Sequence, residues 1–156
     1  DSLITDRTID DYLRWKELRD KGLDNMTDEE RAEWETDLKG AYNVSDLNRV
    51  SAVLNHLKDR LTEAGYLMGI EFNLYTAWLP SDIPTTEQFT KYIKAVETIR
   101  AALAVYRTTP PAPNSKNSLD IEGANNIEKI LIDVNELIKN MLAVRNFCGE
   151  IYSGEI

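Results

Sequence analysis

Three long stripes of apolar residues constrain the fold of this chain more than any other feature. The first stripe consists of Leu47, Val50, Leu54, Leu57, Leu61 and Ala64. The second consists of Phe89, Tyr92, Val96, Ile99, Leu103 and Tyr106. The third begins at Ile127 and continues through Val134 and Met141 to Cys148. Steps of three and four residues place each stripe on one helix face, so the sequence predicts three long helices in an antiparallel bundle.

Two shorter helices are predicted before the bundle. Thr8 and Thr27 are each followed three residues later by an acidic residue, which is the signature of a capping box at a helix start. Gly22 and Gly40 are expected to end these two helices, Gly40 in the left-handed conformation that favours glycine. The two segments together predict a helical hairpin.

These signals predict an all-α protein with a single domain, a size that 156 residues can support. The helical hairpin is expected over residues 1–40 and the three-helix bundle over 45–148. Apolar residues alternate with other residues from Ile70 to Leu74, which predicts one long extended connection between the first two long helices. The Pro-, Ser- and Asn-rich stretch 108–120 is expected to be an exposed loop.

Composition excludes several classes of partner. The net charge of −9, with no cluster of Lys and Arg, argues against nucleic acid and against an anionic membrane surface. No apolar run approaches the roughly 18 residues that cross a bilayer, and no charged-then-apolar leader opens the chain. Because the chain begins at Asp1 rather than with methionine, we expect a piece of a longer protein.

Signals for a catalytic or cofactor site are weak. The single cysteine, Cys148, excludes an intramolecular disulfide, and the single histidine, His56, leaves no His-rich zinc site. There is no Gly-rich phosphate loop, no CxxC pair and no Asp-rich calcium loop. The carboxylates of the second short helix have basic neighbours and read as a solvated face. The sequence therefore favours a non-enzymatic protein without a metal or cofactor.

Large aromatic side chains are the remaining candidates for a binding face. Trp15, Trp34, Tyr75 and Trp78 are large enough to form a surface on which sugar rings stack. The same side chains are equally suited to fixing the hairpin against the bundle, and packing is the favoured reading. Exposure of two or more of them in a shallow groove would favour ligand binding.

The stretch "GAYNVSDLNRV", residues 40–50, combines a glycine, an aromatic residue, two asparagines, a serine, an aspartate and an arginine. Most of it reads as a junction between two helices, in which Asn43 or Ser45 caps the helix that follows. Asn48 and Arg49 face away from the apolar stripe. They are predicted to bind either the neighbouring hairpin or an external partner, and Arg49 is therefore a candidate for an interaction surface.

Several stretches together resemble a known family. They are "LITDRT", "RWKELRDKG", "MTDEERAEW", "GAYNVSDLNRV", "SDIPTTEQFTKYI", "NNIEKILIDVNELI" and the closing "YSGEI". They are similar to a small helical domain of phage and prophage structural proteins from gut bacteria, found in or beside minor tail or tail-fibre-associated proteins. The resemblance implies a virion-associated, non-enzymatic module, made in the bacterial cytoplasm, and it transfers no catalytic residues.

Two functions remain open at the level of sequence. The first is a structural or assembly module of a phage tail protein, with other virion proteins or other domains of a parent chain as partners. The second is a recognition module that binds a host-surface glycan through an aromatic face. The sequence does not determine the oligomeric state.

Overall fold

The computed structural model describes residues 3–36, 38–67, 69, 71–114 and 119–152, from residue 145 onward by the backbone alone. Its helices are α1 (Ile9–Lys21), α2 (Asp28–Glu35), α3 (Val44–Glu63), α4 (Thr86–Ala101) and α5 (Ile121–Tyr152), with one 3-10 turn, η1 (Leu23–Asn25). These described ranges contain no strand. The predicted all-α class is confirmed.

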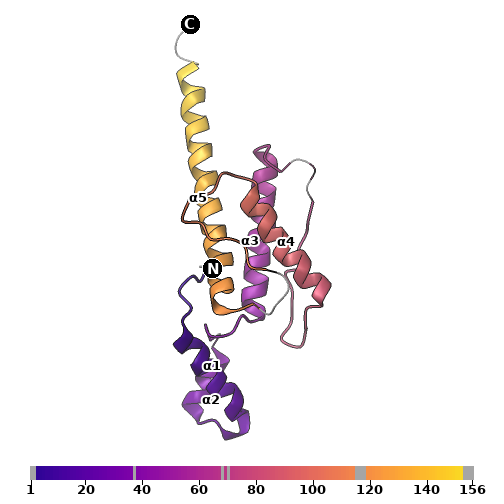
Figure 1. Cartoon of the computed structure of the whole chain (residues 1–156), viewed down its shortest axis with the longest axis vertical. Helices are drawn as coiled ribbons and strands as arrows, with labels where there is room; N and C mark the ends of the chain where they lie inside the picture. The colour runs from indigo at the N-terminus through magenta and orange to yellow at the C-terminus, as the bar shows by residue number, and fades with distance from the viewer. Residues whose placement is uncertain (1–2, 37, 68, 70, 115–118, 153–156) are drawn as a thin grey trace.

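The three long helices form the body of the molecule, and α3, α4 and α5 each pack against the other two. The hairpin of α1 and α2 lies at one end of this body, and α5 extends past the opposite end (Figure 1). At 1.5 Å per residue, the 32 residues of α5 span roughly 48 Å, whereas the 20 residues of α3 span roughly 30 Å. The predicted architecture, a bundle of three long helices with an appended short hairpin, is confirmed.

The long helices run in the same direction, so the predicted antiparallel arrangement is wrong. Arg49 near the start of α3 contacts Glu128 near the start of α5, and Arg60 near the end of α3 contacts Asn135 further along α5. Figure 1 shows α4 rising in the same sense. The reason lies in the connections, because the stretches 64–85 and 102–120 are long enough to return the chain to its starting end.

Several helix boundaries differ from the predicted ones. The second short helix ends at Glu35 rather than Gly40, and Thr36 is its C-cap. Helix α4 ends at Ala101 although the apolar stripe continues to Tyr106. Leu103 of the stripe, together with Val105, still packs against the core from the non-helical chain that follows. The stripe therefore predicts the burial of Leu103 correctly but overestimates the length of the helix.

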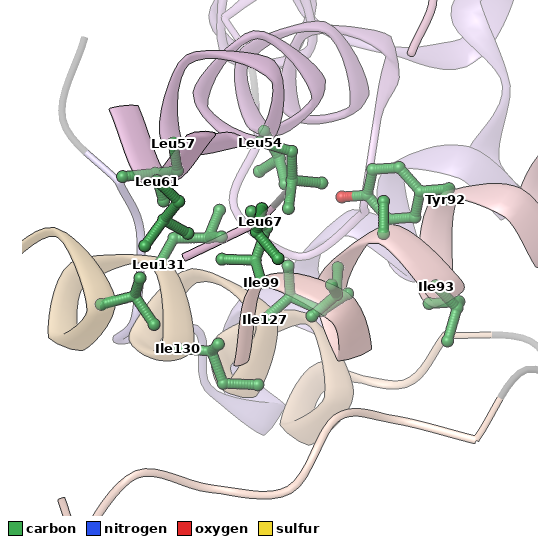
Figure 2. Close-up of a cluster of buried hydrophobic side chains, with 14 of the residues drawn as sticks. Leu54, Leu57, Leu61, Leu67, Tyr92, Ile93, Ile99, Ile127, Ile130 and Leu131 are labelled. Atoms are coloured by element: carbon green, nitrogen blue, oxygen red, sulfur yellow. The ribbon is translucent and has the colours of Figure 1, made fainter. Parts of the chain in front are cut away.

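The core lies where the three stripes meet. Figure 2 shows the side chains of α3, α4 and α5 directed toward one another, with Leu67 from the following connection among them. Residues with no solvent exposure come from all three helices and include Val50, Leu54, Leu61, Val96, Ile99, Ile127, Ile130, Leu131, Val134 and Ile138. Full burial of a Leu or Ile side chain stabilises a fold by about 1.5–3 kcal/mol, so this cluster fixes how the helices pack.

The N-termini of the first four α-helices carry the same local device. The capping side chain accepts a hydrogen bond from the backbone N–H of the third residue after it. The side chain of that third residue accepts a hydrogen bond from the backbone N–H of the cap. The capping residues are Thr8, Thr27, Asn43 and Thr85. These capping boxes satisfy amides that lack a partner within the helix. At α5 the Asp120 side chain accepts from the N–H of Gly123 at 2.7 Å.

Asparagine side chains hold the non-helical segments against the helices. Each of three asparagines binds both the N–H and the C=O of one residue in an extended segment; we call this pair of bonds an asparagine clasp. Asn55 clasps Leu74, with both distances 2.9 Å. Asn48 clasps Trp78, accepting at 2.8 Å and donating at 3.0 Å.

The third clasp fixes the N-terminal segment. Asn125 of α5 accepts from the Arg7 N–H at 3.1 Å and donates to the Arg7 C=O at 2.9 Å. An amide side chain matches a peptide group in offering one donor and one acceptor, so it replaces the partner that a neighbouring strand would supply. The predicted extended segment along the bundle is therefore held by polar bonds as well as by packing.

The connection between α4 and α5 is more buried than predicted. Thr109 is 5% exposed and donates from its hydroxyl to Asp133 of α5 at 2.7 Å. Arg100 donates to the carbonyls of Thr109 and Pro110. The start of the predicted exposed loop is thus anchored, while residues 115–118 lie outside the described residues.

Gly40 is required for close approach rather than for a left-handed conformation. It is not among the described glycines with positive φ, which are Gly22, Gly65 and Gly69. A Cβ atom at Gly40 would lie 2.0 Å from the backbone oxygen of Asp11 in α1. The chain after α2 therefore touches the backbone of α1 at a position that no side chain fits.

We predict that Asn55→Asp lowers the free energy of unfolding by about 1–3 kcal/mol, because a carboxylate cannot donate to the partly buried Leu74 carbonyl. Urea unfolding measures the change. Asn140→Asp, at an exposed position on α5, is the matched control and should change stability by less than about 0.5 kcal/mol. Equal effects of the two substitutions would contradict a structural role for the clasp.

We predict that Gly40→Ala destabilises the protein by about 1–3 kcal/mol or more, because the new methyl group overlaps backbone that cannot move independently. Gly22→Ala is the comparison, since a Cβ there meets no atom within 4 Å and only its φ of 74° is unfavourable. Thermal unfolding should rank Gly40→Ala as the more destabilising. The reverse order would argue against the close contact with α1.

Candidate functional site: an aromatic groove above a buried charge cluster

A large groove lies between the helical hairpin and the bundle. Its volume is about 1240 Å³, and the residues that line it come from α1, α2, the junction into α3, the segment before α4 and the start of α5. Several of them, including Tyr12, Thr36 and Glu122, are exposed, so the groove is open to solvent. It is the larger of the two described pockets; the other has about 150 Å³.

Aromatic and aliphatic side chains form the walls of the groove. Tyr12, Trp15 and Trp34 contribute from the hairpin, and Phe89 contributes from α4. Two prolines and an isoleucine line it ahead of α4, and Leu119 and Ile121 line it at the start of α5. These walls present more apolar than polar surface, which is typical of binding sites.

The hairpin wall is fixed by ion pairs. Arg14 of α1 binds Glu33 of α2 at 2.6 Å, and Lys21 binds Glu30 at 2.6 Å. The bond from Arg14 lowers the pKa of Glu33, and the bond from Lys21 lowers the pKa of Glu30. Both pairs are partly exposed, so each adds little stability, but together they hold the two helices in register.

The conspicuous 40–50 stretch forms the floor of the groove. Every residue from Gly40 to Asn48 except Asp46 lines it. Asn43 caps α3 as predicted, while the Ser45 hydroxyl donates to the Asn43 side chain at 2.7 Å. The stretch is therefore a folding junction, as predicted, and it also lines the groove.

A cluster of four charged side chains lies beneath this floor. Arg7 of the N-terminal segment donates to Asp46 of α3 at 2.8 Å and to Glu128 of α5 at 2.7 Å. Arg49 of α3 donates to the same two carboxylates, at 2.5 Å and 3.1 Å. Glu128 has no solvent exposure, Asp46 has 3% and Arg7 has 5%. Two positive and two negative charges balance within this cluster.

Because the cluster is buried, each of its charged side chains depends on the oppositely charged ones beside it. Glu128 also accepts from the backbone N–H of Ile4 at 2.5 Å. The Nε atoms of Arg7 and Arg49 are buried without a hydrogen-bond partner among the described residues. Such a cluster carries a desolvation cost that is offset only while every charge keeps its opposite.

Arg49, a candidate for an interaction surface, is mostly buried and is bonded within the fold. Burial alone would lower the pKa of its guanidinium, but the charges of Glu128 and Asp46 outweigh that effect and raise the pKa. Asn48 is likewise engaged within the fold, through its clasp on Trp78. The bonds that both side chains make within the fold are to α3, α5 and the extended segment rather than to the predicted hairpin.

A half-buried tyrosine, Tyr42, and a buried one, Tyr92, adjoin the charge cluster. The hydroxyl groups of Tyr42 and Tyr92 are hydrogen-bonded to each other, and the Arg7 guanidinium lies 5.5 Å from the centre of the Tyr42 ring. Burial raises the pKa of both phenols well above the ordinary value. Both rings therefore stay neutral and link the junction to α4.

The four aromatic candidates divide between two places. Trp15 and Trp34 line the groove, whereas Tyr75 and Trp78 line the smaller pocket between the extended segment and α4. Tyr75 and Trp78 pack edge to face at 5.1 Å, and Arg19 lies over the Trp15 ring at 4.8 Å. The four do not form one continuous face.

The other residues considered from the sequence as catalytic or metal-binding candidates are not among the described residues that line the groove. His56 is exposed, and the Cys148 side chain lies outside the described part of the chain. No group of three or more His, Cys, Asp or Glu side chains among the described residues could hold a metal ion. None of the described helices combines the length and apolar character that crossing a membrane requires.

Sequence reasoning missed Arg7 and Glu128. One signal was available: Glu128 lies four residues after Ala124 and three before Leu131, in the middle of the apolar face of α5. A charged residue at such a position needs a buried partner. Nothing in the sequence pattern identified Arg7 as that partner, because the two are 121 residues apart.

Comparison of the chain with protein-family models, with curated proteins and with solved structures returned no match.

We predict that Glu128→Gln lowers the free energy of unfolding by about 3–5 kcal/mol, because it leaves two buried guanidinium groups with one carboxylate. Urea unfolding monitored by circular dichroism measures this loss. Glu136→Gln, at an exposed position on the same helix, should change stability by less than about 0.5 kcal/mol. A similar small effect of both variants would contradict the dependence of the fold on the cluster.

Proposed function

We propose that this chain is a non-enzymatic structural or assembly module of a phage or prophage tail-associated protein. In this proposal it acts through protein–protein contacts, and the groove between hairpin and bundle is the contact surface. The partners are other virion proteins or other domains of a parent chain. The resemblance of the sequence to phage structural proteins supplies the biological context.

The groove carries this proposal. Its volume of about 1240 Å³ exceeds the 300–1,000 Å³ typical of small-molecule sites, and its walls are mainly apolar. The titratable groups near its base, Arg7, Asp46 and Glu128, are bound to one another and support the fold. Such a surface suits recognition of another polypeptide better than it suits chemistry on a substrate.

Recognition of a host-surface glycan is the second candidate function. It is favoured by the presence of both Trp15 and Trp34 in one groove, since indole rings are suited to stacking on sugars. It is weakened because Arg19 already covers the Trp15 ring, and because Tyr12 contacts that ring at 5.8 Å. Among the described tryptophans only Trp34 has neither an aromatic nor a cationic partner.

The proposed function is tested in purified particles. We expect peptides of this chain to be found by mass spectrometry in virions induced from the bacterial host, at a constant ratio to known tail proteins. An abundant cytoplasmic enzyme of the same host is the control for contamination. Absence of the chain from particles that contain complete tails would refute the proposal, as would a gene located away from tail genes.

The glycan candidate is tested with a glycan array probed by the purified protein and by Trp34→Ala. Binding that is lost in the variant, while the variant keeps its unfolding transition, would support the second candidate. Absence of binding across the array would remove it.

A further inference from the structure

We propose that the groove binds a segment of a partner protein that combines apolar side chains with Lys or Arg. This inference rests on the proposed function and specifies the chemistry of the partner at the same groove. The argument uses three properties of the groove: its size, its uncovered apolar residues and the sign of the charges at its rim.

The size of the groove fits a stretch of polypeptide. At about 1240 Å³ it is larger than the cavities that enclose drug-sized ligands, and it is open along exposed lining residues. Peptide segments bind in such grooves through a few apolar anchors on one side of the segment. The structure thus offers room for several consecutive residues.

Apolar side chains that line the groove are exposed to solvent. Ile83 lines it with 87% of its surface exposed, and Tyr12 lines it with 38% exposed. Trp34 also lines the groove, is half-buried, and has no aromatic or cationic partner among the described residues. Burying apolar surface contributes about 25 cal/mol per Å², so apolar groups of a bound segment would gain free energy here.

The rim of the groove is negatively charged. Asp82, Asp120 and Glu122 line it, and none of the described lining residues is a lysine. Its one arginine is Arg7, whose charge is already balanced by Asp46 and Glu128. Glu122 makes no ion pair within the described residues. A segment with cationic side chains flanking its apolar anchors matches both features, because complementary charge favours encounter and fixes register.

The test is a selection from a random 12-residue peptide library on the immobilised protein. We expect the selected peptides to be enriched in Lys, Arg and apolar residues relative to the unselected library. Binding of a selected peptide, measured by fluorescence anisotropy, should weaken as salt concentration rises. Selected peptides without excess positive charge would overturn the inference.

Two matched sets of substitutions separate the groove from the general acidity of the chain. The rim variant carries Asp82→Asn, Asp120→Asn and Glu122→Gln; asparagine keeps an oxygen to accept from the Leu79 and Gly123 N–H groups. The control variant carries Glu63→Gln, Glu97→Gln and Glu136→Gln, all exposed and outside the groove. Both sets remove three negative charges from a net charge of −9.

The rim variant should bind the selected peptides about tenfold more weakly at low salt, and the control variant should stay within about twofold of the original chain. Ile83→Ser should also weaken binding several-fold, and its high exposure means that the fold does not depend on it. Equal losses in the rim and control variants would overturn the inference. Displacement of the peptide by a saccharide would favour the glycan candidate instead.

These outcomes are distinguishable from failure of the proposed function. A chain present in purified tails that selects no basic, apolar peptide would refute this inference alone. A chain that selects such peptides with the expected variant effects, but is absent from purified particles, would refute the phage assignment and leave the chemistry of the groove established.

Discussion

The carboxylate of Glu128 is fully buried on the face of α5 that packs in the core, and groups from two other parts of the chain converge on it. Arg7 reaches it from the N-terminal segment, Arg49 from α3, and the N–H of Ile4 binds it directly. A charge in this position is tolerated only when its partners are in place. The cluster therefore specifies how the N-terminal segment enters the bundle, and with it the position of the hairpin that forms one wall of the groove.

The second constraint comes from the direction of the helices. Because α3 and α5 run in the same direction, each connection must return along the body of the molecule, where its peptide groups need partners. The asparagine clasps on Leu74 and Trp78 meet that need in the first connection, and Arg100 meets part of it in the second by donating to the carbonyls of Thr109 and Pro110. The described residues contain no sheet, and the extended segments are instead held by side chains that supply the hydrogen bonds a neighbouring strand would supply.

The sequence predicted those features that depend on local periodicity. The all-α class, the apolar stripes and the capping boxes at Thr8 and Thr27 depend on residues within a few positions of one another. The direction of the helices depends on how long connections fold back, and the contact between Gly40 and Asp11 depends on the docking of the hairpin, so neither leaves a local signal. The groove was anticipated only in part, since Trp15 and Trp34 meet there while Tyr75 and Trp78 lie elsewhere.

The attachment of the N-terminal segment to α5 determines how this molecule carries mechanical load. Residues 4–7 are bonded to Asn125 and Glu128, and α5 continues from there past the end of the bundle (Figure 1). A pulling force applied at Leu3 and at the distal half of α5 passes through these bonds and along the helix axis. The hairpin and α4 lie outside that line, whereas α3 is connected to it through the bonds of Arg7 with Asp46 and of Arg49 with Glu128. Arg7 lines the groove and lies on this path, so tension would reach the groove through the bonds that Arg7 makes to α3 and α5.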